Sequence, residues 1–104
     1  MAEPTREDVD RMPGPVLLEF GASWCEHCQA MQPGLASIER NYPGVRHIVI
    51  EDGRGLPLGR SFRVKLWPTL VFLRDGKVVS QLVRPSTAEI AKSFEELSRE
   101  PAGE

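Results

Sequence analysis

The strongest constraint on this chain is a pair of cysteines placed where an apolar run gives way to a helix-like stretch. The run at residues 16–20 is followed closely by Trp24-Cys25-Glu26-His27-Cys28, which contains both cysteines of the chain. A strand that leads into a helix through Cys-x-x-Cys is typical of a dithiol–disulfide redox site. In the first turn of such a helix, the Cys25 sulfur can face solvent while the Cys28 sulfur lies beneath it, close enough to bond.

The position of Cys25 favours its reactive form. Near a helix start it would meet unpaired backbone N–H groups and the positive end of the helix dipole. Both favour the thiolate, which is the form that attacks disulfides. The alternative is a structural zinc site, but zinc normally takes four Cys or His ligands in two spaced pairs. The only histidines are His27 and His47, so we expect redox chemistry and no metal.

The composition fits a single globular domain. The chain has 104 residues, of which 40% are hydrophobic and 27% charged, enough to bury one core. No apolar run approaches the ~18 residues of a membrane span, and the acidic N-terminus has no apolar stretch of the signal-peptide type. We therefore expect a cytoplasmic monomer that binds no membrane, with one domain over residues 1–104, its core at 16–99 and a disordered tail at 101–104.

Charge is distributed unevenly along the chain. From Arg54 to Arg84 there are seven basic residues and a single acid, Asp75, whereas the remainder is acidic and brings the net charge to −2. A solvated basic rim is the simplest interpretation, and a surface that attracts acidic protein partners is the alternative. The acidic total and the lack of a known binding motif argue against nucleic acid.

The apolar pattern predicts a mixed sheet covered by helices on both sides. Thr5-x-x-Asp8 and Ser86-x-x-Glu89 mark helix starts, and Arg74-Asp75-Gly76 marks a hairpin. We expect helices at 5–12, 25–42, 58–64 and 86–97, and strands at 16–21, 45–50, 69–73 and 77–83. The core faces of the two long helices would be formed by Met31, Leu35, Ile38 and Tyr42 and by Ile90, Ala91, Phe94 and Leu97.

This order and its motifs resemble the thioredoxin family over residues 16–97. The matching positions are the nucleophilic and resolving cysteines (Cys25 and Cys28), the cis-proline followed by threonine (Pro68-Thr69), the proline that kinks the active-site helix (Pro33) and the buried acid beneath the resolving cysteine (Glu19). The resemblance implies an α/β, thioredoxin-like fold with a central mixed four-stranded sheet flanked by helices. The segment before residue 16 is too short for the family's usual first strand and helix together, and we expect the helix without the strand.

The resemblance also implies an activity, thiol–disulfide exchange. Cys25 would attack protein disulfides, Cys28 would resolve the mixed disulfide, and Glu19, favoured in its protonated form by burial, would exchange a proton with Cys28. Trp24, Trp67 and Pro68 would form the substrate-binding surface, with the backbone of Trp67 exposed to an extended substrate strand. The cofactor would be the dithiol alone, reset by a reductase or a low-molecular-weight thiol.

Several departures from the family pattern bear on direction and substrate. His27 resembles the histidine of the Cys-Gly-His-Cys site in protein disulfide isomerases, and its imidazolium would stabilise the Cys25 thiolate and make the pair more oxidising. Gly21 stands where many thioredoxins carry a second tryptophan, and Trp67 is bulkier than the usual residue. The alternatives are thus a disulfide oxidant or isomerase, or a non-catalytic binding module that holds a partner beside Pro68.

The strand at 45–50 offers no lysine as a partner for Glu19. Arg46 and His47 are the nearest polar residues of that strand. We assign no function to His47 from the sequence, because a histidine on a strand is commonly either exposed or satisfied by an ordinary hydrogen bond.

Overall fold

The computed structural model describes residues 3–53 and 55–99, so the predicted tail at 101–104 lies outside the described residues. The helices are α1 (Arg6–Asp10), α2 (Glu26–Glu39), α3 (Pro57–Ser61) and α4 (Thr87–Ser98), and the strands are β1 (Pro15–Gly21), β2 (Arg46–Glu51), β3 (Thr69–Arg74) and β4 (Lys77–Val83). The predicted order of elements is confirmed. Residues 3–14 contain α1 and no strand, as expected.

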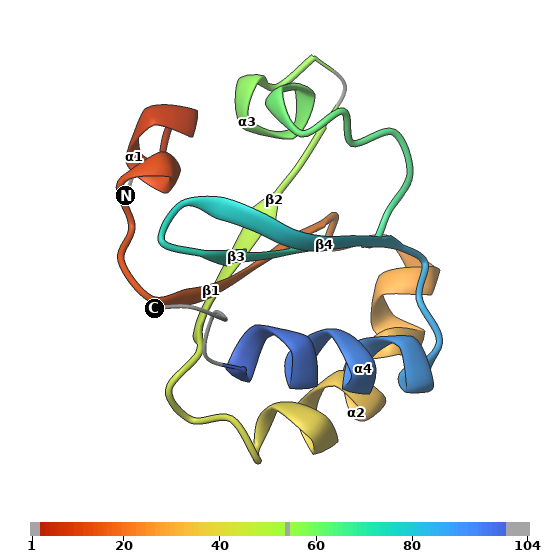
Figure 1. The fold of residues 1–104 in the computed structure, drawn as a ribbon. Helices are drawn as coiled ribbons and strands as arrows, with labels where there is room; N and C mark the ends of the chain where they lie inside the picture. The colour runs from red at the N-terminus through yellow and green to blue at the C-terminus, as the bar shows by residue number, and fades with distance from the viewer. Residues whose placement is uncertain (1–2, 54, 100–104) are drawn as a thin grey trace.

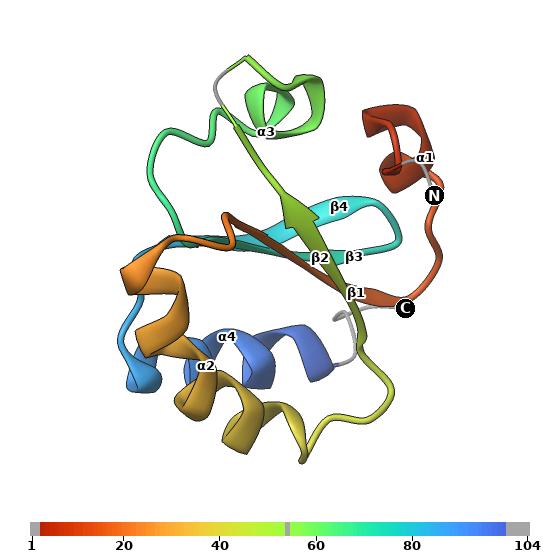
Figure 2. The same cartoon turned by 180° about the vertical axis from the view of Figure 1, so that it is seen from behind.

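The four strands form one mixed sheet in the order β2-β1-β3-β4. β1 runs parallel to β2 and antiparallel to β3, and β3 and β4 form the predicted hairpin. Figures 1 and 2 show three layers, with α1 and α3 on one side of the sheet and α2 and α4 on the other. The central position of β1 places its C-terminal end, and the cysteine motif that follows, between two neighbouring strands.

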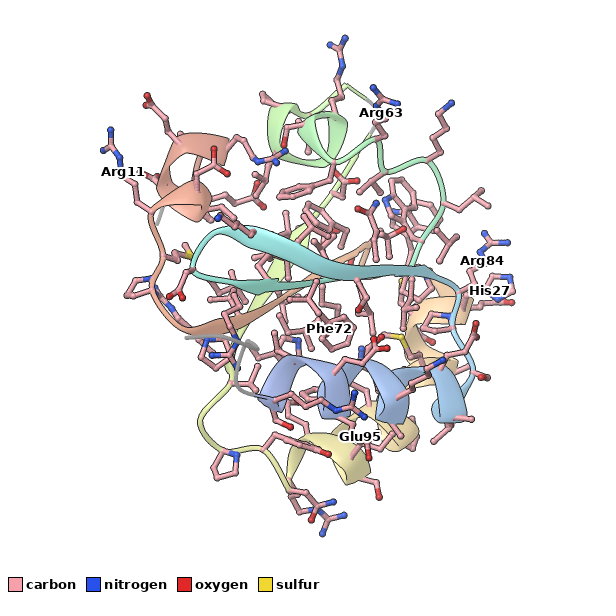
Figure 3. All side chains as sticks on the ribbon, viewed as in Figure 1. Arg11, His27, Arg63, Phe72, Arg84 and Glu95 are labelled. Carbon is pink, nitrogen blue, oxygen red and sulfur yellow. The ribbon has the colours of Figure 1, made fainter. Side chains whose placement is uncertain are left out.

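Side chains of β1 alternate between two separate cores. Val16, Leu18 and Phe20 pack beneath α1 and α3, whereas Leu17 packs beneath α2 and α4 with Phe72 of β3. Figure 3 shows Phe72 between the sheet and α4. Because successive residues of a strand point to opposite faces, Glu19 falls on the same face as Leu17, which is the face that α2 covers.

The N-terminal end of α4 follows the predicted capping box. The Ser86 side chain accepts a hydrogen bond from the Glu89 N–H, and the Glu89 side chain accepts one from the Ser86 N–H. The prediction that Ala91 belongs to the core face of this helix is wrong. Ala91 is exposed, and Ser93 is buried instead. The buried stripe is Ile90, Ser93, Phe94 and Leu97, and Ala91 lies about 100° around the helix from Ile90.

The bounds of α2 are shorter than predicted at both ends. Cys25 is the N-cap and not the first helical residue, and the helix ends at Glu39 where the pattern suggested Tyr42. The chain continues in tight turns, because the Tyr42 N–H donates to the Glu39 carbonyl. The Tyr42 ring still joins the predicted core, stacked on Phe94 with 5.1 Å between ring centroids. Within the described ranges, no helix is both long and apolar enough to cross a bilayer.

Candidate active site

The two cysteines lie at the junction of β1 and α2. Cys25 has an extended backbone, with φ −81° and ψ 114°, and its side chain caps the helix by accepting a hydrogen bond from the Cys28 N–H. The distance from that nitrogen to the Cys25 Sγ is 3.1 Å. A backbone donor at a helix N-terminus stabilises a negative sulfur more than a neutral one. Both cysteines are free thiols in this structure.

Cys25 is more buried than expected. We expected its sulfur to face solvent, but Cys25 is 5% exposed and Cys28 is 6% exposed. The two residues form a small cluster with Ala22, against which the partly buried Trp67 packs. Access to Cys25 is through a cavity of about 490 Å³, termed the tryptophan cavity below. Its lining comprises Trp24, Cys25, Glu26, His27, Lys65, Leu66, Trp67 and Arg84.

The two tryptophans meet beside Cys25. Their rings are nearly perpendicular, at 78°, with 5.4 Å between centroids, which is the edge-to-face geometry that aromatic pairs prefer. Trp24 is 69% exposed. Trp67 is held more firmly, because its indole Nε1 donates to the Asp52 Oδ2 at 2.9 Å. The pair therefore combines one exposed ring with one ring that packs against the core beneath α1 and α3.

The backbone around Pro68 is tied to β4. The Trp67–Pro68 peptide bond is cis. The Arg84 N–H donates to the Pro68 carbonyl, and the Arg84 Nε donates to the Trp67 carbonyl, each at 2.9 Å. We expected the Trp67 backbone to be open to a substrate strand, but its carbonyl is already engaged by a guanidinium that reaches it from the end of the hairpin.

The Cys28 thiol has a raised pKa. Burial, followed by the hydrogen bond with the Cys25 side chain, raises the pKa of Cys28 from 9.0 to about 11. The negative charge of Glu19 adds to the increase in the pKa of Cys28. A thiol with such a pKa stays protonated at neutral pH until a nearby base removes its proton.

Glu19 is buried, at 4% exposure, and is hydrogen-bonded on both carboxylate oxygens. Its Oε2 accepts from the Gln32 amide at 2.5 Å, and its Oε1 lies 2.7 Å from the His47 Nε2. The other ring nitrogen, Nδ1, lies 2.7 Å from the Glu39 Oε2. The structure thus brings together four side chains from β1, α2 and β2.

Two members of this network were missed in the sequence, and one was undervalued. Gln32 and Glu39 follow Cys28 by four and eleven residues, which place all three on one face of α2. That spacing could have identified Gln32 and Glu39 as residues on the same helix face as Cys28. His47, to which we assigned no function, is the partner of Glu19, because β2 pairs in parallel with β1 and presents alternate side chains to α2.

A second cavity separates Glu19 from Cys28. It measures about 210 Å³ and is lined by both residues together with Gly21 and Gln32, among others. The missing side chain of Gly21 leaves this space, since a Cβ there would lie 2.8 Å from the Cys28 Sγ. A cavity of this size that is lined by the Glu19 carboxylate has room for water. Below it is termed the Gly21 cavity.

His27 lies at the exposed rim of the site. It lines both the tryptophan cavity and an adjoining cavity of about 240 Å³ that runs past Pro68 towards α4. Arg84 lines the same two cavities, and Figure 3 shows the two side chains together at one end of the molecule. Within the described part of the chain, no three His, Cys, Asp or Glu side chains are grouped so that they could hold a metal ion.

The family model for thioredoxin matches residues 3–96. The chain belongs to the thioredoxin family. Among solved structures it is similar to thioredoxin 2 from Pseudomonas aeruginosa PAO1 in its reduced form, at 55% identity and a TM-score of 0.80, covering 91% of this chain and 89% of that one. The α/β, thioredoxin-like fold with a mixed four-stranded sheet is thereby confirmed.

More distant relatives agree on the fold. The chain is 35% identical over 79 residues to a thioredoxin H-type of Populus jackii, covering 76% of this chain and 57% of that protein. It spans little more than half the length of that relative. Mitochondrial thioredoxin 3 from Saccharomyces cerevisiae, in its oxidised form, superposes with a TM-score of 0.76 at 24% identity, covering 86% of this chain and 84% of that one.

Proposed function

We propose that this thioredoxin-family chain is a thiol–disulfide oxidoreductase that reduces protein disulfides through a reversible Cys25–Cys28 pair. The observation that carries the proposal is the 3.1 Å hydrogen bond from the Cys28 N–H to the Cys25 Sγ at the N-terminus of α2. It makes Cys25 the sulfur that is stabilised as a thiolate. The raised pKa of Cys28, about 11, keeps this thiol protonated until the second exchange.

The reaction is two successive exchanges. The Cys25 thiolate attacks one sulfur of a substrate disulfide, the S–S bond breaks, and the other substrate sulfur leaves as a thiolate that water protonates. Cys28 then loses its proton to the Glu19 carboxylate and attacks the Cys25 sulfur. The bond between Cys25 and the substrate breaks, and the second substrate sulfur leaves as a thiolate. The substrate gains two electrons, and the chain is left with a Cys25–Cys28 disulfide.

Turnover requires an external reductant. A reductase or a low-molecular-weight thiol would return two electrons to the disulfide, and no nucleotide, flavin or metal in this chain is required. We propose a reducing compartment such as the cytoplasm as the setting, and a monomer as the working form.

The tryptophan cavity supports a specific kind of substrate surface. Trp24 and Trp67 supply apolar area beside the buried Cys25. Two basic residues, Lys65 and Arg84, and a single acid, Glu26, line the same cavity, so its charge is positive on balance. A disulfide flanked by an apolar residue and an acidic residue would match both features. The extended backbone of such a substrate would have to share the Trp67 carbonyl with Arg84, or displace the Arg84 side chain from it.

Trapping the intermediate tests the proposed sequence of events. Because Cys28 makes the second attack, Cys28→Ser should accumulate a covalent mixed disulfide with oxidised insulin, detected as a mass shift that a dithiol reverses. Cys25→Ser is the matched control and should trap nothing under the same conditions. If Cys28→Ser forms no adduct with any oxidised substrate, or if adducts form through Cys28 alone, the assignment of the two sulfurs is wrong.

His27 favours a second candidate function, a disulfide oxidant or isomerase. The imidazole lines the cavity that exposes Cys25, and in its protonated form it would stabilise the thiolate and therefore the reduced state. We expect His27→Pro to lower the reduction potential of the pair, measured against glutathione buffers at neutral pH. A wild-type potential clearly above the cytosolic poise would favour the oxidant, and an unchanged potential in His27→Pro would remove the histidine from the argument.

A third possibility, a binding module with inert cysteines, makes the opposite prediction for both experiments. Such a module would form no adduct with oxidised insulin in Cys28→Ser and would show no equilibration of Cys25 and Cys28 with glutathione, while still retaining a partner in the cavity beside Pro68.

A further inference from the structure

We propose that His47 and Glu39 form a proton relay that connects buried Glu19, and through it Cys28, with solvent near the C-terminal end of α2. The proposal rests on the proposed function, because it concerns the proton that Cys28 must lose during resolution. It assigns a positioning and relay function to two residues that touch neither the sulfurs nor the substrate.

The need for a relay follows from burial. Cys28 and Glu19 are 6% and 4% exposed. A buried carboxylate can accept one proton from Cys28, but it must then release that proton before the next turnover. A substrate docked over the cysteines would cover the tryptophan cavity, which leaves the Gly21 cavity and the hydrogen-bonded far side of Glu19 as the remaining routes.

The far side of Glu19 is built as a continuous chain. From the Glu19 Oε1 to the His47 Nε2 is 2.7 Å, and from the His47 Nδ1 to the Glu39 Oε2 is again 2.7 Å. Both are within the range of charge-assisted hydrogen bonds. Side-chain exposure rises along the same path, from 5% at Glu19 to 19% at His47 and 28% at Glu39. The chain therefore starts in the core and ends at water.

Imidazole is suited to the middle position because its two ring nitrogens can accept and release protons at opposite ends. The step balances from a neutral imidazole that carries its proton on Nδ1. Cys28 gives its proton to Glu19, Glu19 passes it to the unprotonated His47 Nε2, and the imidazolium that forms gives its Nδ1 proton to Glu39, which releases it to water. Proton exchange with water then returns the ring to the Nδ1–H tautomer. A lysine or arginine in this place could hold Glu19 but has no second acceptor nitrogen.

The groups that face His47 support a charged imidazole. They are Glu19 from β1 and Glu39 from α2, with Cys28 beyond Glu19, and the neutral Gln32 amide holds the other Glu19 oxygen. Arg46, the neighbour on β2, is exposed and lies on the opposite face of the strand. Burial alone would lower the pKa of His47, but the hydrogen bonds and charges of the two glutamates outweigh it and raise that pKa above 6.5.

The test is a single-turnover measurement with an aromatic disulfide that releases a coloured thiolate at each exchange. The first phase reports the attack by Cys25 and the second reports resolution by Cys28. In His47→Gln and in Glu39→Gln we expect the second phase at neutral pH to slow by roughly tenfold or more, with a changed pH profile. Added imidazole buffer should restore the rate in proportion to its concentration, because a small base can replace the relay.

The Glu39→Gln variant keeps the test valid if His47→Gln unfolds, since Glu39 is partly exposed and its replacement should leave the fold intact. One further variant serves as the control. Glu95→Gln, on the exposed face of α4 (Figure 3), is the matched loss of one carboxylate and should leave both phases unchanged.

The outcomes separate the relay from the proposed function. If Glu19→Gln slows the second phase while both relay variants keep the wild-type rate and pH profile, the relay is wrong and the proposed function stands. If the relay variants slow resolution but no buffer base restores it, the two residues are structural and the relay is again wrong. If Cys28→Ser still releases the second thiolate, the proposed function itself fails.

Discussion

At the scale of single residues, Trp67 links the active site to the core. It packs against the cysteine cluster and also against the core beneath α1 and α3, and its Nε1 donates to the buried Asp52. Gly21 acts on the other cysteine, since the space that it leaves beside Cys28 forms the cavity next to Glu19. The sequence marked both residues as departures from the family, and the structure gives each a specific contact.

Trp67→Phe should destabilise the protein by about 1–3 kcal/mol, because it leaves a buried carboxylate oxygen of Asp52 without its donor. Trp24→Phe is the matched control: Trp24 is 69% exposed, so its replacement should change the free energy of unfolding by no more than about 0.5 kcal/mol. Chemical denaturation of the two variants makes the comparison. Equal losses would mean that the indole hydrogen bond contributes nothing measurable.

At the scale of elements, α2 carries most of the proposed chemistry on one face. Its N-cap is Cys25, its first turn holds Cys28, and Gln32 and Glu39 continue the same face towards the last turn. Its opposite contact is with α4, where Gly34 allows a close approach: a Cβ there would lie 2.7 Å from the Thr87 hydroxyl. One helix therefore fixes the spacing between the sulfurs and the outer end of the relay.

At the scale of the whole molecule, the reduced protein should lose stability as pH rises, in two separate windows. The pKa of His47 is raised in the folded state, so its contribution is complete below about 6.5 and is lost as pH rises through the higher folded value. The pKa of Cys28 is raised from 9.0 to about 11, so the unfolded thiol ionises first and stability falls between those values.

Denaturant midpoints measured against pH for both redox states check these windows. The disulfide form has no Cys28 thiol and should lack the alkaline window that the reduced form shows. His47→Gln should lack the window near neutrality. An oxidised protein that loses as much stability in the alkaline window as the reduced protein would contradict the assignment to Cys28.

Much of this protein follows from local sequence alone. Alternating and continuous apolar runs specify the strands, Ser86 and Glu89 specify the start of α4, and Cys-x-x-Cys after a buried strand specifies where the sulfurs lie. These features depend on hydrogen bonds and side-chain directions within a few residues, which the order of amino acids fixes directly. The placement of Glu19 on the α2 side of the sheet follows from the same alternation.

Only the tertiary structure decided what surrounds those residues. These surroundings include the burial of Cys25, the hydrogen bond from Arg84 to the Trp67 carbonyl, and the contacts of His47 with Glu19 and Glu39, which join different helices and strands. Such contacts depend on strand order, on register and on how closely α2 lies against β2, and none of these is encoded in a local pattern. The sequence by itself determined which chemistry the site carries, and the packing of α2 on the sheet decided where the proton from that chemistry can go.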